Sequence, residues 1–459
     1  MDGLFASENL WKIGVLAILG VIAFMGMLRN ARVGFIFLGA MIFLSGLGLT
    51  ENADKMQEYR TWLYVLQTNR QLAYAGCAGL LLLGVMVHAA KVNSRTVPVL
   101  GLMVMLQGIY MGIINIFQGE VSGGLQAVVF TIFSMSAILL SISSQLKSWD
   151  DIVDLLRMLI TVGAVWTLAC TVQFAVDQSV LLTGNARRFV GLSGNPQHAA
   201  GLSAVMSTIA LWLVLNDAKK FWKVIAIFTL TTHVIFVLWT ASRTGLALTT
   251  MGFASVLYAR LGRAVFFAPV LVGAGYGLLT LAQSMGVEFG FERLSSRDDT
   301  RTAQWGILWE NGLNNPIIGV GLTEAGASEN GFLYGFAAFG LGVPVIMACI
   351  MLVTIGIWFR MLRSRFETPN PTGKRVVDLC LGFFVMYWAG NMFEGFGVAR
   401  ISPQLSYFLI FACIAACTVT VASEERALIR EAGQEDLEAL PAPDYDEPYG
   451  DYKPATNAN

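Results

Sequence analysis

The sequence predicts an all-α, polytopic integral membrane protein with about 12–13 transmembrane helices. Of its 459 residues, 55% are hydrophobic and only 13% are charged, whereas a soluble domain carries about 25% charged residues. The apolar residues form continuous runs long enough for a helix to cross a bilayer, without the alternation that is typical of membrane β-strands. This composition excludes a soluble enzyme, a nucleic-acid-binding protein and a disordered scaffold.

The candidate spans follow one another along most of the chain. They are residues 12–28, 33–49, 71–90, 97–117, 124–143, 155–176, 199–215, 223–240, 244–259, 264–283, 331–358, 377–393 and 402–421. The stretch 284–330 is the longest hydrophilic one between them and predicts one large loop. Within it Arg301, Trp305 and Trp309 recur every four residues, as expected for a short amphipathic helix on the membrane surface.

Charge divides the chain unevenly. From Ala422 to the end there are 10 acidic and 3 basic residues, a net charge of −7, and the remaining body carries +6. The acidic part contains four prolines and has no apolar period, which predicts a disordered tail. We therefore expect N-terminal transmembrane helices (1–176), a membrane core that includes the large loop (177–421) and an acidic cytoplasmic tail (422–459).

The loops differ in their content of lysine and arginine. Placing the richer set in the cytoplasm leaves 50–70, 177–198 and 284–330 outside. The two later outer segments nevertheless carry arginines, namely Arg187, Arg188, Arg293, Arg297 and Arg301. Positive charge on this side of the membrane indicates an anionic partner there.

Arg243 lies between two apolar runs, in the sequence S-R-T-G (242–245). A charge at the centre of a membrane helix costs about 2.5–3.5 kcal/mol, so it normally faces a cavity or a partner. Two interpretations stay open. The side chain binds an anion at the outer face, or it extends from a helix end to the membrane interface.

Arg293, Arg297 and Arg301 recur at a spacing of four and would form one basic stripe on a helix. The planar guanidinium group suits phosphate because it donates to two oxygens at once. Alternatively, the acidic residues among them neutralise Arg293 and Arg297 on a solvated face.

Two residues are candidate general bases. Glu329 directly precedes a Gly-rich apolar run, and His198 directly precedes another apolar run. Either side chain could take a proton from a substrate hydroxyl. Each could instead lie in the polar first turn of its helix, where the dipole stabilises a carboxylate. No cluster of His, Cys and carboxylate residues has metal-ligand spacing.

Four motifs occur in a definite order. The first is Arg188 followed by G-x-x-x-N-P (191–196), and the second is S-R-T-G (242–245). The third is R-x-x-x-W (301–305), and the fourth is N-P-I-I-G-V-G (315–321). After the fourth motif come a polar residue, Asn330 and a Gly-rich helix. Between about residues 180 and 360 this series resembles the O-antigen ligase and O-antigen polymerase superfamily of bacterial envelope glycan enzymes. The amino-terminal helices match that superfamily only in being hydrophobic.

The resemblance implies a GT-C-like membrane glycosyltransferase in the bacterial inner membrane, with its active face in the periplasm. Its partners would be an undecaprenyl-diphosphate-linked glycan, a lipid or glycan acceptor and membrane lipids, and it would need no metal or other cofactor. Arg243 and Arg301, together with Arg188, would hold the donor diphosphate, and Arg297 joins them from the basic stripe. Fixed guanidinium groups would stabilise the charge of the departing diphosphate.

The sequence departs from the superfamily at one important place. Members often have His-Asn before the Gly-rich helix, where their base is expected, and here the pair is Glu329-Asn330. We assign Glu329 and His198 as the candidate catalytic residues. The departure keeps other hypotheses open, namely a transporter or flippase of lipid-linked glycans and a non-catalytic member of a polysaccharide assembly complex.

Overall fold

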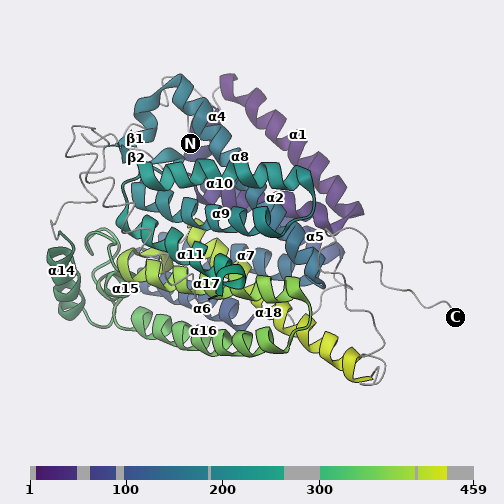
Figure 1. Cartoon of the computed structure of the whole chain (residues 1–459). Helices are drawn as coiled ribbons and strands as arrows, with labels where there is room; N and C mark the ends of the chain where they lie inside the picture. The colour runs from purple at the N-terminus through teal and green to yellow at the C-terminus, as the bar shows by residue number, and fades with distance from the viewer. Residues whose placement is uncertain are drawn as a thin grey trace, which may run out of the picture.

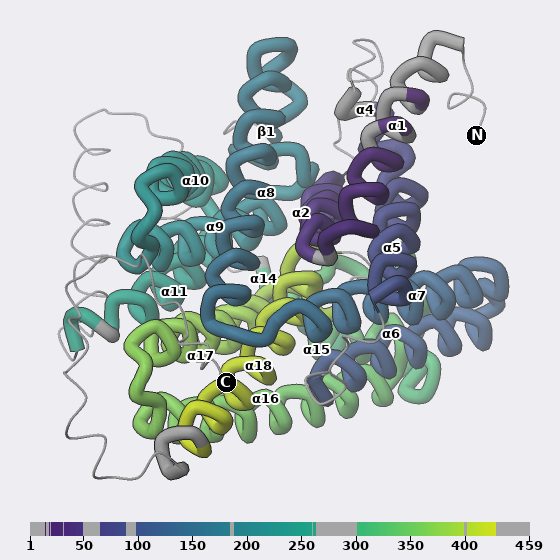
Figure 2. Tube along the Cα trace, turned by 90° about the vertical axis from the view of Figure 1, so that its right-hand side faces the viewer, coloured from purple at the N-terminus to yellow at the C-terminus, as the bar shows by residue number. Residues whose placement is uncertain are grey.

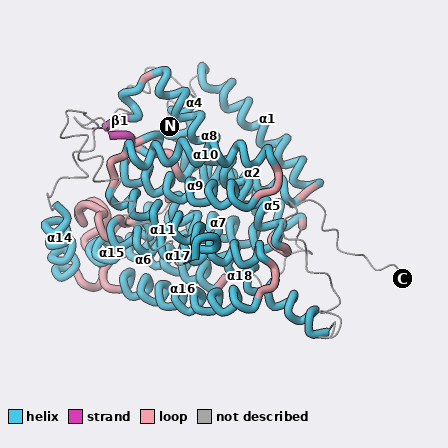
Figure 3. Tube along the Cα trace, viewed as in Figure 1, coloured by secondary structure: helices cyan, strands magenta, loops and turns pink. Residues whose placement is uncertain are grey.

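The computed structural model describes residues 7–48, 62–88, 98–183, 188–262, 300–398 and 402–431, which are almost entirely helical (Figure 1). The helices are α1 (Ser7–Arg29), α2 (Gly34–Ser45), α4 (Trp62–Thr68), α5 (Arg70–Val87), α6 (Val99–Phe117), α7 (Val121–Gln145), α8 (Trp149–Val176), α9 (Pro196–Asn216), α10 (Lys220–Trp239), α11 (Arg243–Leu261), α14 (Thr300–Asn314), α15 (Gly331–Phe339), α16 (Gly342–Glu367), α17 (Pro371–Phe393) and α18 (Pro403–Glu431). Two short strands, β1 (Leu182–Thr183) and β2 (Arg188–Phe189), pair in antiparallel fashion with Leu182 opposite Phe189 (Figure 3).

Nine helices within the described ranges are long and apolar enough to cross a membrane. They are α5, α6, α7, α8, α9, α10, α16, α17 and α18. Two shorter apolar helical segments, Gly20–Arg29 and Gly34–Ser45, fall in the predicted spans 12–28 and 33–49. The all-helical, multi-pass membrane architecture is thus confirmed. The predicted span 244–259 forms α11, which is not among the nine, and the predicted span 264–283 lies outside the described residues.

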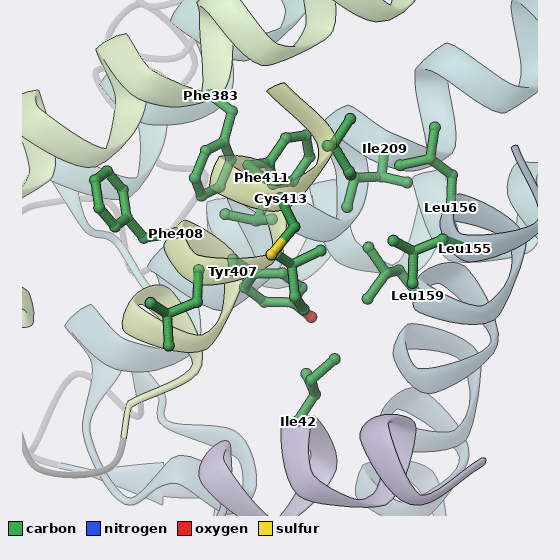
Figure 4. Packing of buried hydrophobic residues seen from close by; sticks show 14 of the residues in the cluster. Ile42, Leu155, Leu156, Leu159, Ile209, Phe383, Tyr407, Phe408, Phe411 and Cys413 are labelled. Atoms are coloured by element: carbon green, nitrogen blue, oxygen red, sulfur yellow. The ribbon is translucent and has the colours of Figure 1, made fainter. Parts of the chain in front are cut away.

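Three helices form the centre of the bundle. Buried residues make up 83% of the membrane-crossing window of α18, 78% of that of α9 and 72% of that of α17, but only 22% of those of α5, α10 and α16. In Figure 2, α18 lies in the middle of the bundle. Its aromatic rings stack on those of α17. The ring centroids of Phe383 and Phe411 are 4.0 Å apart (Figure 4), and those of Tyr387 and Phe408 are 4.1 Å apart.

Helix α11 packs closely between α9 and α17 because small residues face each other. A Cβ atom on Gly252 would lie 2.1 Å from Thr208 Oγ1, and one on Gly382 would lie 1.9 Å from Ser255 Oγ. Such contacts between small residues let membrane helices approach backbone to backbone. The approach fixes the start of α11 against the start of α9, which matters for the site described below.

The predicted single span 331–358 is divided in the structure. Helix α15 ends at Phe339, and α16 begins at Gly342. Gly340 adopts a left-handed φ of 75°, and a Cβ atom there would lie 2.2 Å from the Ile317 carbonyl oxygen. The N–H of Leu341 donates to the Pro316 carbonyl at 2.8 Å. The N-P-I-I-G-V-G loop therefore packs against the break between α15 and α16. The uniformly apolar sequence 331–358 does not reveal this break.

Helix α14 confirms the helix expected in the large loop. It stands at one edge of Figure 1, across the end of the bundle. Arg301 and Trp305 are half-buried and Trp309 is exposed, whereas Leu308 is fully buried. Gly312 lies against the ring of Phe336 in α15, only 2.3 Å from where a Cβ atom would sit. The inward face of α14 thus includes Leu308 and Gly312, beside the predicted row of Arg301, Trp305 and Trp309.

Helix α18 continues to Glu431, into the region where we expected the acidic tail to begin. Trp149 Nε1 donates to Glu425 Oε1 at 2.7 Å, and Arg426 pairs with Glu367 of α16. These contacts hold the first residues of the predicted tail against the bundle. Residues 432–459 lie outside the described residues.

Ion pairs gather at the end of the bundle opposite α14. Arg157 of α8 donates to both carboxylate oxygens of Asp217, at 2.7 and 2.6 Å, and Arg365 pairs with Asp378. Asp217 follows the last residue of α9, a helix of 21 residues and therefore about 30 Å long. The arginines at the two ends of the bundle are thus about a membrane thickness apart.

We expect Asp217→Ala to lower the free energy of unfolding by about 3 kcal/mol, because Arg157 stays buried without its bidentate partner. Asp154, which also accepts from Arg157 at 2.8 Å, keeps the loss at the lower end of the range for buried pairs. Thermal unfolding in detergent measures the change. The control is Asp150→Ala, which removes an exposed carboxylate from α8, the helix that carries Arg157. Equal melting temperatures for the two variants would contradict the prediction.

Candidate functional site

Three helices begin at the end of the bundle near α14. The first residue before each carries a side chain that caps the helix: Asn195 for α9, Ser242 for α11 and Asn330 for α15. The start of α11 touches α9 directly, because a Cβ atom on Gly245 would lie 2.4 Å from Ala200 Cβ. Helix N-termini carry partial positive charge and favour anions. The S-R-T-G and N-P motifs therefore build neighbouring capped helix starts.

The segment 392–396, at the end of α17, connects these helix starts. Asn330 Nδ2 donates to the Met392 carbonyl at 2.9 Å, and Gly395 N–H donates to the Ser328 carbonyl at 2.7 Å. A Cβ atom on Gly395 would lie 2.9 Å from Ser328 Cβ, so glycine permits this approach. These bonds place the loop that carries Glu329 beside the end of α17.

Arg301 lies at the junction of α11, α14 and α17. Its Nη2 donates to Thr244 Oγ1 and to Glu394 Oε1, both at 3.1 Å, and its Cζ lies 5.3 Å from the centre of the Phe393 ring. Thr244 also donates to Glu394 Oε1, at 3.4 Å. The Glu394 side chain is only 7% exposed, whereas that of Arg301 is 31% exposed. The Arg301 side chain is therefore held by contacts with α11 and the end of α17 and is still partly exposed.

Arg188 and Arg243 lie on the two sides of the turn between α10 and α11. Arg188 Nε donates to the Thr240 carbonyl at 2.9 Å. Arg243 is the first residue of α11 and is exposed, so its charge is at a helix end and not in the middle of a membrane helix. This position fits both interpretations of Arg243. Arg297, with Arg293, lies outside the described residues.

An aromatic stack holds Arg188 in place. The neighbouring Phe189 ring lies between Phe236 and Trp239 of α10, with centroids 4.4 and 5.3 Å away. The β1–β2 pair adds backbone hydrogen bonds to the same short segment. A polar side chain on a packed, paired strand keeps a defined position, which suits a ligand contact.

Glu329 and His198, the candidate bases, lie on different sides of segment 392–396. Glu329 is half-buried, and its Oε2 is shielded from solvent without a hydrogen-bond partner among the described residues. The centres of the His198 and Phe396 rings are 5.8 Å apart in an edge-to-face contact. The positively charged Arg70 side chain lies near the His198 ring. No hydrogen bond joins the two candidates within the described ranges, and the caps of their helices are Asn330 and Asn195 instead.

Sequence reasoning missed Glu394, Thr244 and Arg70. Glu394 follows an apolar span and belongs to no motif. It is nevertheless an isolated carboxylate at the end of a span, which is a usable signal because such charges are costly. Arg70 resembles any basic residue at the start of a span. Its Nη1 donates to the Leu47 carbonyl, beside the loop before α9. Their convergence depends on helix packing that no local pattern encodes.

No group of three or more His, Cys, Asp or Glu residues suited to a metal ion occurs within the ranges that the structure describes. In comparisons of the sequence with protein-family models and with curated proteins, nothing matches. The functional assignment therefore depends on the site itself.

We expect Asn330→Ala to destabilise the protein by about 2 kcal/mol, because it removes both the cap of α15 and the bond to Met392. Asn330→Ser keeps a capping oxygen and should lose only about 1 kcal/mol. Thermal unfolding in detergent separates the two variants. Equal losses would show that the cap contributes nothing, and a Ser variant as stable as the original protein would show that the Asn330–Met392 bond contributes nothing.

Proposed function

We propose that this protein is a membrane glycosyltransferase that transfers or polymerises a glycan from an undecaprenyl-diphosphate donor onto an acceptor hydroxyl. In this proposal the fold is GT-C-like, the protein lies in the bacterial inner membrane, and the α14 end of the bundle faces the periplasm. The observation that carries the proposal is Arg301, which is held among converging helix starts while its side chain stays 31% exposed.

The charge at this end of the bundle supports a diphosphate ligand. Arg188 and Arg243 flank the start of α11, and Arg301 contacts its second residue, Thr244. Guanidinium groups bind phosphate oxygens with strong, charge-assisted hydrogen bonds. When the bond between the sugar and the diphosphate breaks, negative charge accumulates on the leaving oxygen, and positive groups already in place stabilise it. Arg297 is proposed as a further contact.

Glu329 is the better candidate for the base. Its Oε2, which has no hydrogen-bond partner in the part of the chain that the structure describes, could take a proton from the acceptor hydroxyl, whereas the Glu394 carboxylate is already bound to Arg301. His198 is the second candidate, because its ring lies beside Phe396 at the same end of the bundle. The acceptor is a lipid or a glycan that presents a hydroxyl group between the donor and this base.

The positions of buried charges favour an enzyme over a flippase. A translocation path for a diphosphate would need basic residues along the interior of several helices. Among the described residues, the buried charged side chains are Asp151, Arg157, Asp217, Asp378 and Glu394. They lie near the two ends of the bundle.

Proteoliposomes with a labelled lipid-linked glycan test this choice, because translocation without new glycosidic bonds would support the transporter.

Arg301→Ala should reduce glycan transfer at least about a hundredfold, because it removes a preorganised contact to the leaving diphosphate. The measurement is product formation by purified protein with a polyprenyl-diphosphate-linked glycan. Arg363→Ala removes an exposed arginine at the opposite end of the bundle and serves as the control. Normal transfer by a folded Arg301→Ala variant would refute the donor site.

Glu329→Gln should lower the rate of transfer about a hundredfold, the usual contribution of a general base, while donor binding stays within about twofold of the original. His198→Gln, measured in parallel, should retain more activity. Comparing donor binding with turnover separates a catalytic role from a binding role. If His198→Gln is inactive and Glu329→Gln active, the base is His198.

A further inference from the structure

Glu394 has surroundings that resemble an anion-binding site. Its carboxylate is buried, and it accepts hydrogen bonds from the Arg301 guanidinium and the Thr244 hydroxyl. Thr244 is the second residue of α11, so the carboxylate also lies at the positive end of that helix. An arginine, a hydroxyl and a helix N-terminus are the groups that bind phosphate in many proteins. Glu394 thus occupies the environment that the proposed function gives to the donor.

The position of Glu394 on its own helix is unfavourable. It follows the last residue of α17, at the end where the helix dipole is negative and repels a carboxylate. Its burial is therefore compensated from outside α17, by Arg301 and the start of α11. The same contacts occupy the carboxylate, because Oε1 already accepts from Arg301 and Thr244.

We propose that Glu394 is the internal counter-ion of Arg301. It positions the guanidinium group, and its negative charge lowers the affinity of the site for diphosphate so that the leaving group departs after transfer. This inference rests on the proposed function and deepens it by assigning a residue to product release. Glu394 is a positioning residue, since it acts through Arg301 and does not contact the reacting atoms.

Glutamine separates the two roles of this side chain. The Oε1 atom of a glutamine accepts the same hydrogen bonds from Arg301 and Thr244, so the guanidinium group keeps its place. The negative charge is lost, and with it the repulsion of an incoming anion. A purely structural role for Glu394 predicts the opposite result, weaker binding in a less stable protein.

We expect Glu394→Gln to bind inorganic pyrophosphate about tenfold more tightly than the original protein. The repulsion between two unit charges near a protein surface is large enough to change the affinity by this factor. The measurement is calorimetric titration of the full chain in lipid nanodiscs, repeated with undecaprenyl diphosphate. In steady-state transfer, both kcat and KM should fall, because release becomes slower. Glu310→Gln makes the same charge change at an exposed position of α14 and should alter neither quantity.

The gain should disappear when Arg301 is also replaced. In the pair Arg301→Ala and Arg301→Ala/Glu394→Gln, the second substitution should change the affinity less than twofold, because without Arg301 the pyrophosphate is no longer held beside residue 394. Equal or weaker binding by a folded Glu394→Gln variant overturns the counter-ion role and leaves the donor site intact. Absence of pyrophosphate binding in all variants overturns the donor site as well. Glu394→Asn is the second neutral variant if glutamine prevents folding.

Discussion

The contact between Arg301 and Glu394 joins three helices that are far apart in the sequence. Thr244 brings in the start of α11, Arg301 the start of α14, and Glu394 the end of α17. The adjoining residues of segment 392–396 bind the loop before α15 and touch α9 through His198. Because the carboxylate is buried, it requires this partner. This ion pair therefore joins α11, α14 and α17 at the end of the bundle, beside the backbone bonds of segment 392–396.

Much of the fold could be predicted from apolar runs. A membrane helix must form its backbone hydrogen bonds internally, so its length and apolar composition are visible in the sequence. The exceptions have local physical causes. The break after Phe339 depends on a loop that docks at Gly340, and the extension of α18 depends on Glu425 and Arg426 finding partners on other helices. Both are tertiary contacts, which a hydropathy pattern does not contain.

The site was only partly predictable for the same reason. The motifs marked the helix starts correctly, since Asn195, Ser242 and Asn330 act through local capping bonds. The excess of arginine in the predicted outer segments also selected Arg188 and Arg301, which are held by hydrogen bonds. Glu394 is the partner of Arg301, 93 residues away, and no spacing rule connects residues at that separation.

The two ends of the bundle use arginine in different ways. At one end Arg157 is buried against Asp217, a bidentate pair in which the guanidinium group is largely satisfied by protein. At the other end Arg301 is shared between a hydroxyl and a carboxylate and is about a third exposed, and Arg243 is exposed. A satisfied arginine stabilises a fold, whereas an exposed one beside helix N-termini attracts anions. Both kinds occur in the same chain, so the difference in exposure, and not the presence of arginine, is what favours the α14 end as the proposed anion-binding end.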